Sequence, residues 1–282
     1  MAEPAHATNP GTWRGDQIEP PRPGPLGWVL VVARAVPIIA VLGAGVVVLS
    51  LLRVVERLFT GPRRPVTGPF VQGICRLVLA ILGLGWQREG RPLRGPGAVV
   101  ANHASWLDIF VLNAAQPVFF VAKSEVSAWP GINILTRVTD THFVRRDPRL
   151  AASQAAEFAA RIAAGHRLLF FPEGTSTDGL RVQPFKPTLF QGFLAVDLPA
   201  DLAIQPVSVI YQAPKGEDAR FYGWWGDMAL GPHLLAVLSA RRQGRVRVIL
   251  HDPIPVAGET RKTLSAKAQA AVAGALSADR EG

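Results

Sequence analysis

One long apolar run dominates the N-terminal part of the chain. It extends from Leu26 to Leu52, and only Arg34 and Pro37 interrupt it. About 20 apolar residues are enough to cross the hydrocarbon core of a bilayer. A cleaved signal peptide would be shorter and would lie closer to the start of the chain. The pattern therefore predicts a helix that anchors the protein to a membrane.

The residues on either side of this run differ from it in composition. Residues 1–25 are rich in proline, glycine and scattered polar groups, which is typical of a disordered tail. More arginines follow the run than precede it: Arg53, Arg57, Arg63 and Arg64 come after it, and Arg14 and Arg22 before it. Because positive residues favour the cytoplasmic side of a membrane, we expect the rest of the chain to be cytoplasmic.

A second apolar stretch runs from about Phe70 to Trp86 and is broken by Gln72 and Arg76. It is short for a membrane span. A helix that lies in the membrane interface, or that packs beside the first helix, accounts better for this pattern. We expect residues 26–90 to form the membrane-anchoring region.

From Gly97 onwards, short apolar runs alternate with helical patterns. The predicted strands are Ala98–Ala101, Val118–Ala122, His142–Val144, Leu168–Phe171, Ile204–Ile210 and Val246–Leu250. The clearest helix is Pro148–Ala164, with Asp147 as its N-cap and Gly165 just past its end. This alternation predicts an α/β domain over residues 91–282, built on a mixed sheet flanked by helices.

Composition narrows the class of protein. Hydrophobic residues make up 49% of the chain and charged residues only 18%, which favours membrane association. The formal net charge of +9 indicates an acidic partner: nucleic acid, an anionic membrane surface or a phosphorylated substrate. A nucleic-acid-binding protein would not explain the apolar run, so we expect membrane lipids and no nucleic acid.

The side chains of cysteine and histidine indicate no metal site. The single cysteine, Cys75, excludes an intramolecular disulfide and a cysteine-rich metal site. The four histidines of the α/β region other than His103 lack metal-ligand spacing and are interpreted as structural: His142, His166, His233 and His251. We therefore expect no bound metal ion.

The first chemical motif runs from Asn102 to Asp108 and includes His103, directly after a predicted strand. On a continuous helix His103 and Asp108 would lie about 140° apart. If His103 occupies the strand-to-helix turn and Asp108 lies one turn into the helix, the carboxylate can point back at the imidazole. A carboxylate on one ring nitrogen fixes the tautomer and raises the basicity of the other. An isolated His-x4-Asp is more often incidental to a capped helix.

Three further motifs follow. A buried strand runs into Phe171-Pro172-Glu173-Gly174-Thr175, a sharp turn with an acid and a hydroxyl at its rim. The β-like run at Phe143 ends in Arg145 and Arg146, whose guanidinium groups suit two-pronged contacts with phosphate. An apolar strand contains Pro206. Each motif by itself also fits an ordinary turn, a solvated charge pair or a buried strand.

The order and spacing of these motifs resemble those of the glycerolipid acyltransferase family, which includes the bacterial 1-acylglycerol-3-phosphate acyltransferases. The family carries Asn-His-x4-Asp, an arginine after apolar residues, Phe-Pro-Glu-Gly-Thr and a proline-containing strand. The matching positions are Asn102, His103, Asp108, Arg146, Phe171 through Thr175, and Pro206. The resemblance covers residues 99–210 closely and the remainder loosely.

The resemblance implies a His-Asp dyad in which His103 removes the proton of a lysolipid hydroxyl as that hydroxyl attacks a thioester. Arg146, Glu173, Gly174 and Thr175 would position the acceptor head group, and Thr175 could also stabilise the oxyanion. The acyl donor would be an acyl carrier protein or a coenzyme A thioester, with no further cofactor. We expect the enzyme at the bacterial inner membrane. A non-catalytic lipid-binding membrane protein of the same fold is the alternative.

One position departs from the resemblance. Members dedicated to lysophosphatidic acid usually carry Arg directly after Phe-Pro-Glu-Gly-Thr, and Ser176 stands there. The stretch 221–228, with Pro232 and His233 after it, is similar to the lyso-ornithine lipid acyltransferases of bacteria. Losing an arginine removes a strong phosphate contact. We therefore expect lyso-ornithine lipid, 1-acylglycerol-3-phosphate or both as acceptor, with the first slightly favoured.

Overall fold

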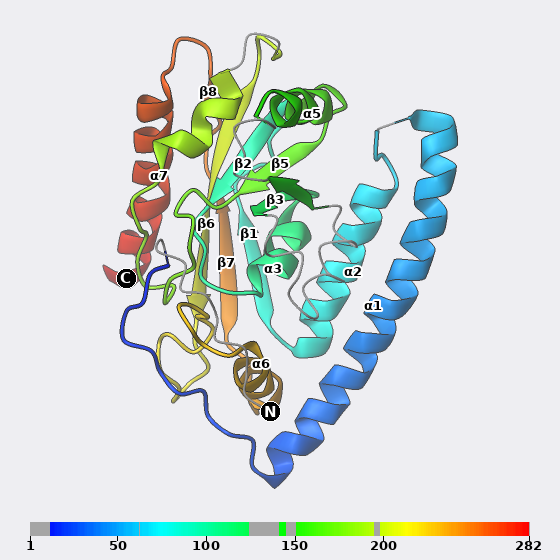
Figure 1. The fold of residues 1–282 in the computed structure, drawn as a ribbon. Coiled ribbons are helices and arrows are strands. Elements are labelled where there is room, and N and C mark those ends of the chain that lie inside the picture. Colours follow the sequence, from blue (N-terminus) through cyan, green and yellow to red (C-terminus); the bar gives the residue numbers. More distant parts are fainter. Residues whose placement is uncertain (1–11, 62, 124–140, 145–150, 195–197, 282) are drawn as a thin grey trace.

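An eight-stranded mixed sheet forms the centre of the domain (Figure 1). The computed structural model describes residues 12–61, 63–123, 141–144, 151–194 and 198–281. Its strands are β1 (Gly85–Glu89), β2 (Gly97–Ala101), β3 (Phe119–Lys123), β4 (His142–Val144), β5 (Arg167–Phe170), β6 (Ala203–Gln212), β7 (Arg245–Leu250) and β8 (Ile254–Pro255). Their order is β1-β7-β6-β2-β5-β3-β4, with β8 beside β6. The predicted α/β class and mixed sheet are confirmed.

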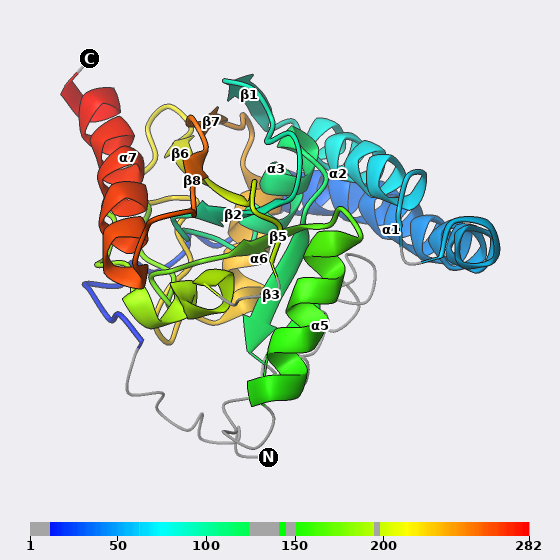
Figure 2. The same ribbon diagram turned by 90° about the horizontal axis from the view of Figure 1, so that it is seen from above.

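Helices cover both faces of this sheet. They are α1 (Pro25–Thr60), α2 (Thr67–Leu82), α3 (Asp108–Ala115), α5 (Ala151–Ala163), a 3-10 helix (Pro187–Leu194), α6 (Leu230–Ser239) and α7 (Arg261–Glu281). The view from above shows α1, α2 and α3 on one side of the strands and α7 on the other (Figure 2). The sheet is therefore the middle layer of three.

The strands are apolar on both faces because both faces are covered. Along β2, Val99 and Ala101 belong to a core that includes residues of α2 and α3. The alternate residues, Ala98 and Val100, belong to a second core that includes residues of α7 and the 3-10 helix. All four side chains are fully buried. This explains why β2 reads as a continuous apolar run.

The direction of the strands decides where polar loops meet. Strand β2 pairs in parallel with β5 on one side and with β6 on the other. The carboxyl ends of β2 and β5 therefore lie side by side, and the segments that follow them begin at Asn102 and Phe171. The mixed character of the sheet comes from β7, which is antiparallel to β6.

The predicted apolar run lies within α1, which is long and apolar enough to cross a membrane. Arg34 is charged, yet it has partners in the domain: its guanidinium donates to the carbonyls of Leu238 and Ala240 at 2.7 and 2.6 Å. These carbonyls are at the C-terminal end of α6, where a positive charge is favoured. Arg34 thus fastens α1 to α6 rather than marking the end of the apolar helix.

The structure differs from the sequence prediction around residue 85. The second apolar stretch is helical only as far as Leu82, and Trp86 lies in β1, which pairs with β7. The sheet therefore begins before residue 91, where the domain boundary was expected. Strand β1 escaped prediction because it is an edge strand whose residues are mostly exposed, and so it has no apolar alternation.

The predicted strands agree with the structure to within two residues at each end. Helix α5 ends at Ala163, and Gly165 follows it with φ +84°, as expected for a glycine past a helix end. The predicted start of this helix at Pro148, its N-cap Asp147, and the arginines Arg145 and Arg146 lie outside the described residues.

Residues 12–24 belong to the predicted tail and contain no helix or strand, but they contact the domain. This segment runs from the start of α1 across the lower part of the domain (Figure 1). We call residues 12–17 the N-terminal strap. The backbone N–H of Trp13 donates to the hydroxyl of Thr175 at 3.1 Å, so the strap lies against one of the motif loops. Residues 1–11 are outside the described residues.

Candidate active site

Asn102 ties the end of β2 to β6. Its side-chain oxygen accepts the N–H of Val209 at 2.8 Å, and its side-chain nitrogen donates to the carbonyl of Val209 at 2.9 Å. The buried amide thus replaces a backbone peptide where the β2–β6 ladder has ended. This fixes the position from which the chain turns to His103.

His103 and Asp108 are in direct contact, with 2.7 Å between Nδ1 and Oδ2. The same carboxylate oxygen accepts the backbone N–H groups of Ala104 and Ser105 at 2.9 and 3.1 Å. As predicted, His103 lies in the turn between strand and helix. Asp108, however, is the first residue of α3 rather than one turn inside it, because the carboxylate closes a tight turn on its own preceding backbone.

Tyr211 is a member of this cluster that sequence reasoning missed. Its hydroxyl donates to the second oxygen of Asp108, Oδ1, at 2.7 Å. Burial, together with the nearby Asp108, raises the pKa of Tyr211 well above its usual value, so the phenol stays protonated and remains a donor. Nothing in the apolar run of β6 distinguishes this tyrosine from a core residue, since its partner lies 103 positions away.

The imidazole of His103 is held in place and still reaches solvent. Its ring stacks on Phe171 with 4.0 Å between ring centroids. The side chain is 23% exposed, whereas that of Asp108 is fully buried. Because Asp108 accepts a hydrogen bond from Nδ1–H, the other nitrogen, Nε2, carries the lone pair and can receive a proton from an alcohol.

Glu173 is buried, with 1% of its surface exposed, and its carboxyl group accepts two backbone N–H groups. One carboxylate oxygen accepts the N–H of His103 at 2.7 Å, and the other accepts the N–H of Gln183 at 2.7 Å. Burial raises the pKa of this carboxyl to about 8, against the lowering effect of the two N–H donors. These contacts make Glu173 a support of the His103 turn.

Gly174 lets the loop approach a lysine. Its φ is +70°, and a Cβ at this position would lie 2.7 Å from Nζ of Lys186. The backbone N–H of Lys186 donates to the carbonyl of Pro172 at 2.9 Å, which holds the lysine beside the motif. Lys186 brings positive charge to the loop that carries Ser176, and no sequence motif had indicated it.

The hydroxyl of Thr175 is engaged on both sides. It accepts the N–H of Trp13 and donates to the carbonyl of Ser176 at 3.2 Å. In this arrangement its proton is directed at the carbonyl of Ser176. Of the predicted acceptor-binding residues, Glu173, Gly174 and Thr175 thus share one loop beside His103, and Arg146 is outside the described residues.

The segment similar to lyso-ornithine lipid acyltransferases packs on the His103 turn. The N–H of Trp224 donates to the carbonyl of Ala104 at 2.8 Å. The indole N–H of Trp106 donates to Nδ1 of His233 at 3.0 Å. Burial lowers the pKa of His233 to about 4, so its ring is neutral and can accept this bond. His233 therefore has the structural role that we expected.

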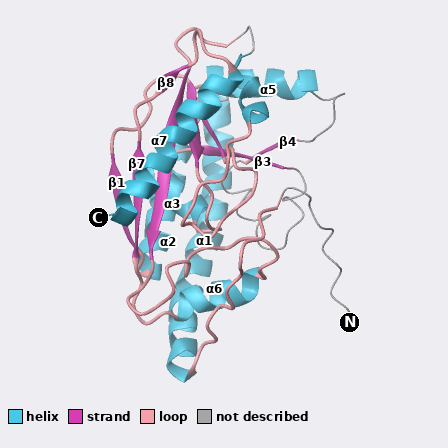
Figure 3. Ribbon diagram, turned by 90° about the vertical axis from the view of Figure 1, so that its left-hand side faces the viewer, coloured by secondary structure: helices cyan, strands magenta, loops and turns pink. Residues whose placement is uncertain are grey.

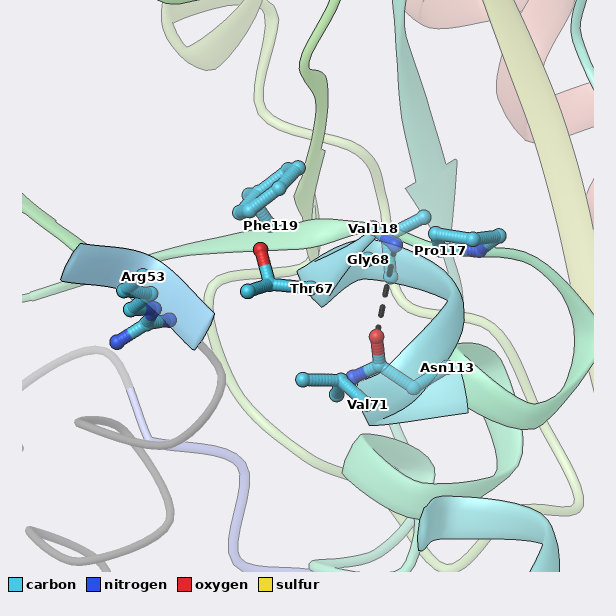
Figure 4. A pocket seen from close by; sticks show the side chains of 8 residues that line it. All are labelled: Arg53, Thr67, Gly68, Val71, Asn113, Pro117, Val118 and Phe119. Atoms are coloured by element: carbon cyan, nitrogen blue, oxygen red, sulfur yellow. Dashed lines mark hydrogen bonds between the residues drawn. The ribbon is translucent and has the colours of Figure 1, made fainter. Parts of the chain in front are cut away.

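Two hollows lie where α2 meets β3, and neither is lined by a residue of the motifs. The smaller has a volume of about 10 Å³, and the labelled side chains around it include Thr67, Val71 and Asn113 (Figure 4). The larger, about 320 Å³, is lined by several residues that include Arg63 and Arg64. The smaller hollow has too little room for a lipid head group.

Comparison with known proteins assigns the family. The acyltransferase family model matches residues 87–210, which hold His103, Asp108 and the loop from Phe171 to Thr175. The lyso-ornithine lipid O-acyltransferase of Rhodobacter capsulatus is 50% identical over 262 residues, which cover 92% of this chain and 95% of that protein. This chain belongs to the acyltransferase family. The family assignment favours a lysolipid O-acyltransferase over the non-catalytic alternative.

One further relative by sequence and one solved structure are also similar to this chain. The 1-acyl-sn-glycerol-3-phosphate acyltransferase of Neisseria meningitidis is 37% identical over 171 residues, which cover 59% of this chain and 65% of that protein. The crystal structure of the 1-acyl-sn-glycerophosphate acyltransferase of Thermotoga maritima has a TM-score of 0.60 at 20% identity, covering 90% of this chain and 96% of that one. The latter shows that the two chains share a fold.

Removing the Tyr211 hydroxyl tests its role beside Asp108. Tyr211→Phe keeps the ring and leaves Oδ1 of a buried carboxylate without this donor, a loss of about 1.5–3 kcal/mol for a hydrogen bond to a charged group. We expect kcat/KM for acyl transfer to fall about tenfold or more. Tyr222→Phe is the matched control, because the Tyr222 hydroxyl donates to Gln243 instead. Equal losses in the two variants would contradict the proposed role.

The buried carboxyl of Glu173 predicts a pH-dependent stability. Its pKa of about 8 lies above the ordinary value of 4.5, so the folded state keeps the proton to higher pH than the unfolded chain. Its contribution to the free energy of unfolding therefore falls as pH rises through this window, by at most about 1.4 kcal/mol per pH unit. Denaturant titrations should show a shallower decline for Glu173→Gln than for wild type. The exposed control Glu217→Gln should keep the wild-type slope.

Proposed function

We propose that this acyltransferase moves a fatty acyl chain from a thioester of acyl carrier protein or coenzyme A to a hydroxyl of a lysolipid at the bacterial inner membrane. The observation that carries the proposal is the His103–Asp108 pair. Asp108 holds the imidazole at Nδ1, and the ring stays partly exposed at the carboxyl end of the sheet. In an open α/β sheet, this edge is where substrates bind.

The reaction needs one base and no covalent acyl-enzyme. As the lysolipid oxygen attacks the thioester carbonyl, its proton passes to Nε2 of His103. The buried carboxylate of Asp108 stabilises the imidazolium that forms. When the tetrahedral intermediate collapses, the carbon–sulfur bond breaks and the leaving thiolate takes the proton from His103. The products are an ester and a free thiol.

Lyso-ornithine lipid is the acceptor that we favour. The relative from Rhodobacter capsulatus, matched over nearly the whole chain, carries that activity in its name. Ser176 supports the same assignment, because it lacks the guanidinium with which Arg would bind a phosphate monoester. The relative from Neisseria meningitidis supports 1-acylglycerol-3-phosphate as a second acceptor. Arg146 and Lys186 are the cations that we propose for the acidic groups of either head group.

Helix α1 anchors the domain while lying along it. The N-terminal strap precedes α1 and contacts the domain, and Arg34, in the first third of α1, contacts α6. The surface of α1 that the domain does not cover exposes large apolar side chains along its length, among them Val32, Ile39, Leu51 and Phe59. We propose that this face enters the bilayer from the cytoplasmic side and brings His103 close to lipid substrates.

The acceptor and the base are tested in one assay. Full-length protein in membranes receives acyl carrier protein or coenzyme A thioesters together with lyso-ornithine lipid or 1-acylglycerol-3-phosphate. We expect the higher kcat/KM with lyso-ornithine lipid. His103→Ala should lower kcat by about 10²–10⁴-fold, the usual contribution of a general base. His251→Gln, at a histidine bonded to Ser208, is the control that keeps turnover. Wild-type rates from His103→Ala would contradict the mechanism.

Ser176→Arg tests the basis of acceptor choice. An arginine here would offer a bidentate contact to a phosphate monoester. We expect the ratio of kcat/KM for 1-acylglycerol-3-phosphate to that for lyso-ornithine lipid to rise about tenfold. Ser277→Arg, at an exposed position on α7, adds the same charge as a control and should leave the ratio unchanged. An unchanged ratio in both variants would separate Ser176 from acceptor choice.

A further inference from the structure

The N-terminal strap reaches across the chain to the loop that follows Thr175. Besides its backbone contact with Thr175, Trp13 places its ring 5.2 Å from the guanidinium carbon of Arg181. That guanidinium is paired with Asp178, which is 97% buried, at 2.9 Å. A cation over an indole face is attracted to it. Trp13 therefore covers the outer side of the segment from Thr175 to Arg181.

A second loop holds the other side of the strap. Trp225, only 1% exposed, donates its indole N–H to the carbonyl of Gly15 at 3.1 Å. Its ring centroid lies 5.8 Å from that of Trp13. Arg14 pairs with Asp227 at 3.3 Å. The strap is thus clamped to the loop that contains Trp225 by packing, by a hydrogen bond and by charge.

Both of these loops border His103. The N–H of Thr177 donates to the carbonyl of His103 at 2.9 Å, and the N–H of Trp224 donates to the carbonyl of Ala104 at 2.8 Å. The strap therefore bridges the two segments that flank the catalytic turn. A change in the docking of Trp13 can therefore shift the turn, because each of the two loops is hydrogen-bonded directly to it.

The docked strap leaves the base open. With Trp13 bound to Thr175, the side chain of His103 is still 23% exposed. A segment that plugged the site would bury this imidazole. The strap instead occupies the hydroxyl of Thr175 and the outer face of Arg181, next to Ser176. It has the position of a wall beside the substrate rather than of a plug.

We propose that the N-terminal strap is a wall of the acceptor site and that Trp13 is a positioning residue for the acceptor head group, acting through Thr175 and Arg181. This inference rests on the proposed function, since it assigns the strap to the lysolipid side of that reaction. Because the wall is already ordered, no further entropy is lost in ordering it when the head group binds. Losing it weakens acceptor binding without removing the base.

Steady-state kinetics of the full-length protein in membranes test the wall. Trp13→Ala should raise KM for lyso-ornithine lipid about tenfold, the scale of a lost ring–cation contact with its packing, and leave KM for the acyl donor within about twofold. Trp13→Phe keeps an aromatic face and should recover much of the loss. Trp28→Ala is the matched control, because Trp28 is half exposed on α1 and outside the strap.

The comparison between KM for the acceptor and KM for the acyl donor, together with kcat, decides the outcome. An unchanged acceptor KM in Trp13→Ala overturns the proposal. A rise in kcat also overturns it, because it would identify the strap as an inhibitory plug. Equal rises in both KM values with a lowered midpoint of thermal unfolding overturn it too, since they would reduce Trp13 to a general structural role.

Limited proteolysis measures how firmly the strap is docked, and it does not depend on acyl transfer. Trypsin can cut after Arg14, whereas the bond after Arg22 resists because Pro23 follows. By linkage, an acceptor that binds against the docked strap must stabilise its docking. Lyso-ornithine lipid should slow cleavage at Arg14 in the wild type more than in Trp13→Ala. No effect, or faster cleavage, overturns the wall even if acyl transfer is observed, whereas protection without any transfer would overturn only the proposed function.

Discussion

The buried carboxylate of Asp108 is the group on which the site depends. A carboxylate away from water is stable only with donors around it. It has four: the ring nitrogen of His103, the N–H groups of Ala104 and Ser105, and the hydroxyl of Tyr211. These donors join the end of β2, the start of α3 and strand β6. The interaction that orients the His103 imidazole therefore also holds three elements of the fold together.

Glu173 is a second buried carboxyl group, and it too accepts backbone N–H groups beside His103. Glu173 accepts one N–H from the His103 turn and one from Gln183, each at 2.7 Å, so it couples the two motif loops. The Thr177 N–H to His103 carbonyl bond adds a further tie. Figure 3 shows α6 below the strands of the sheet. The position of His103 thus depends on backbone that buried side chains hold in place.

The anchor and the site belong to one structural unit. Arg34 of α1 is bonded to the end of α6, and the strap ahead of α1 is bonded to Thr175. The apolar face of α1 is therefore fixed relative to His103. If α1 enters the bilayer as proposed, His103 keeps its place relative to the membrane surface, where a lipid acceptor can reach it.

The sequence by itself determined the elements whose signals are local. Apolar runs located α1 and the buried strands, Gly165 marked the end of α5, and the order of the motifs indicated His103 and Asp108. Tertiary structure alone decided the rest: Tyr211 meets Asp108 across 103 positions, and Trp13 meets Thr175 across 162. Neither residue carries a local pattern, because each contact depends on which strands and loops the chain brings side by side. Periodicity depends on residues that are neighbours in the sequence, whereas these contacts depend on how the fold brings distant segments together.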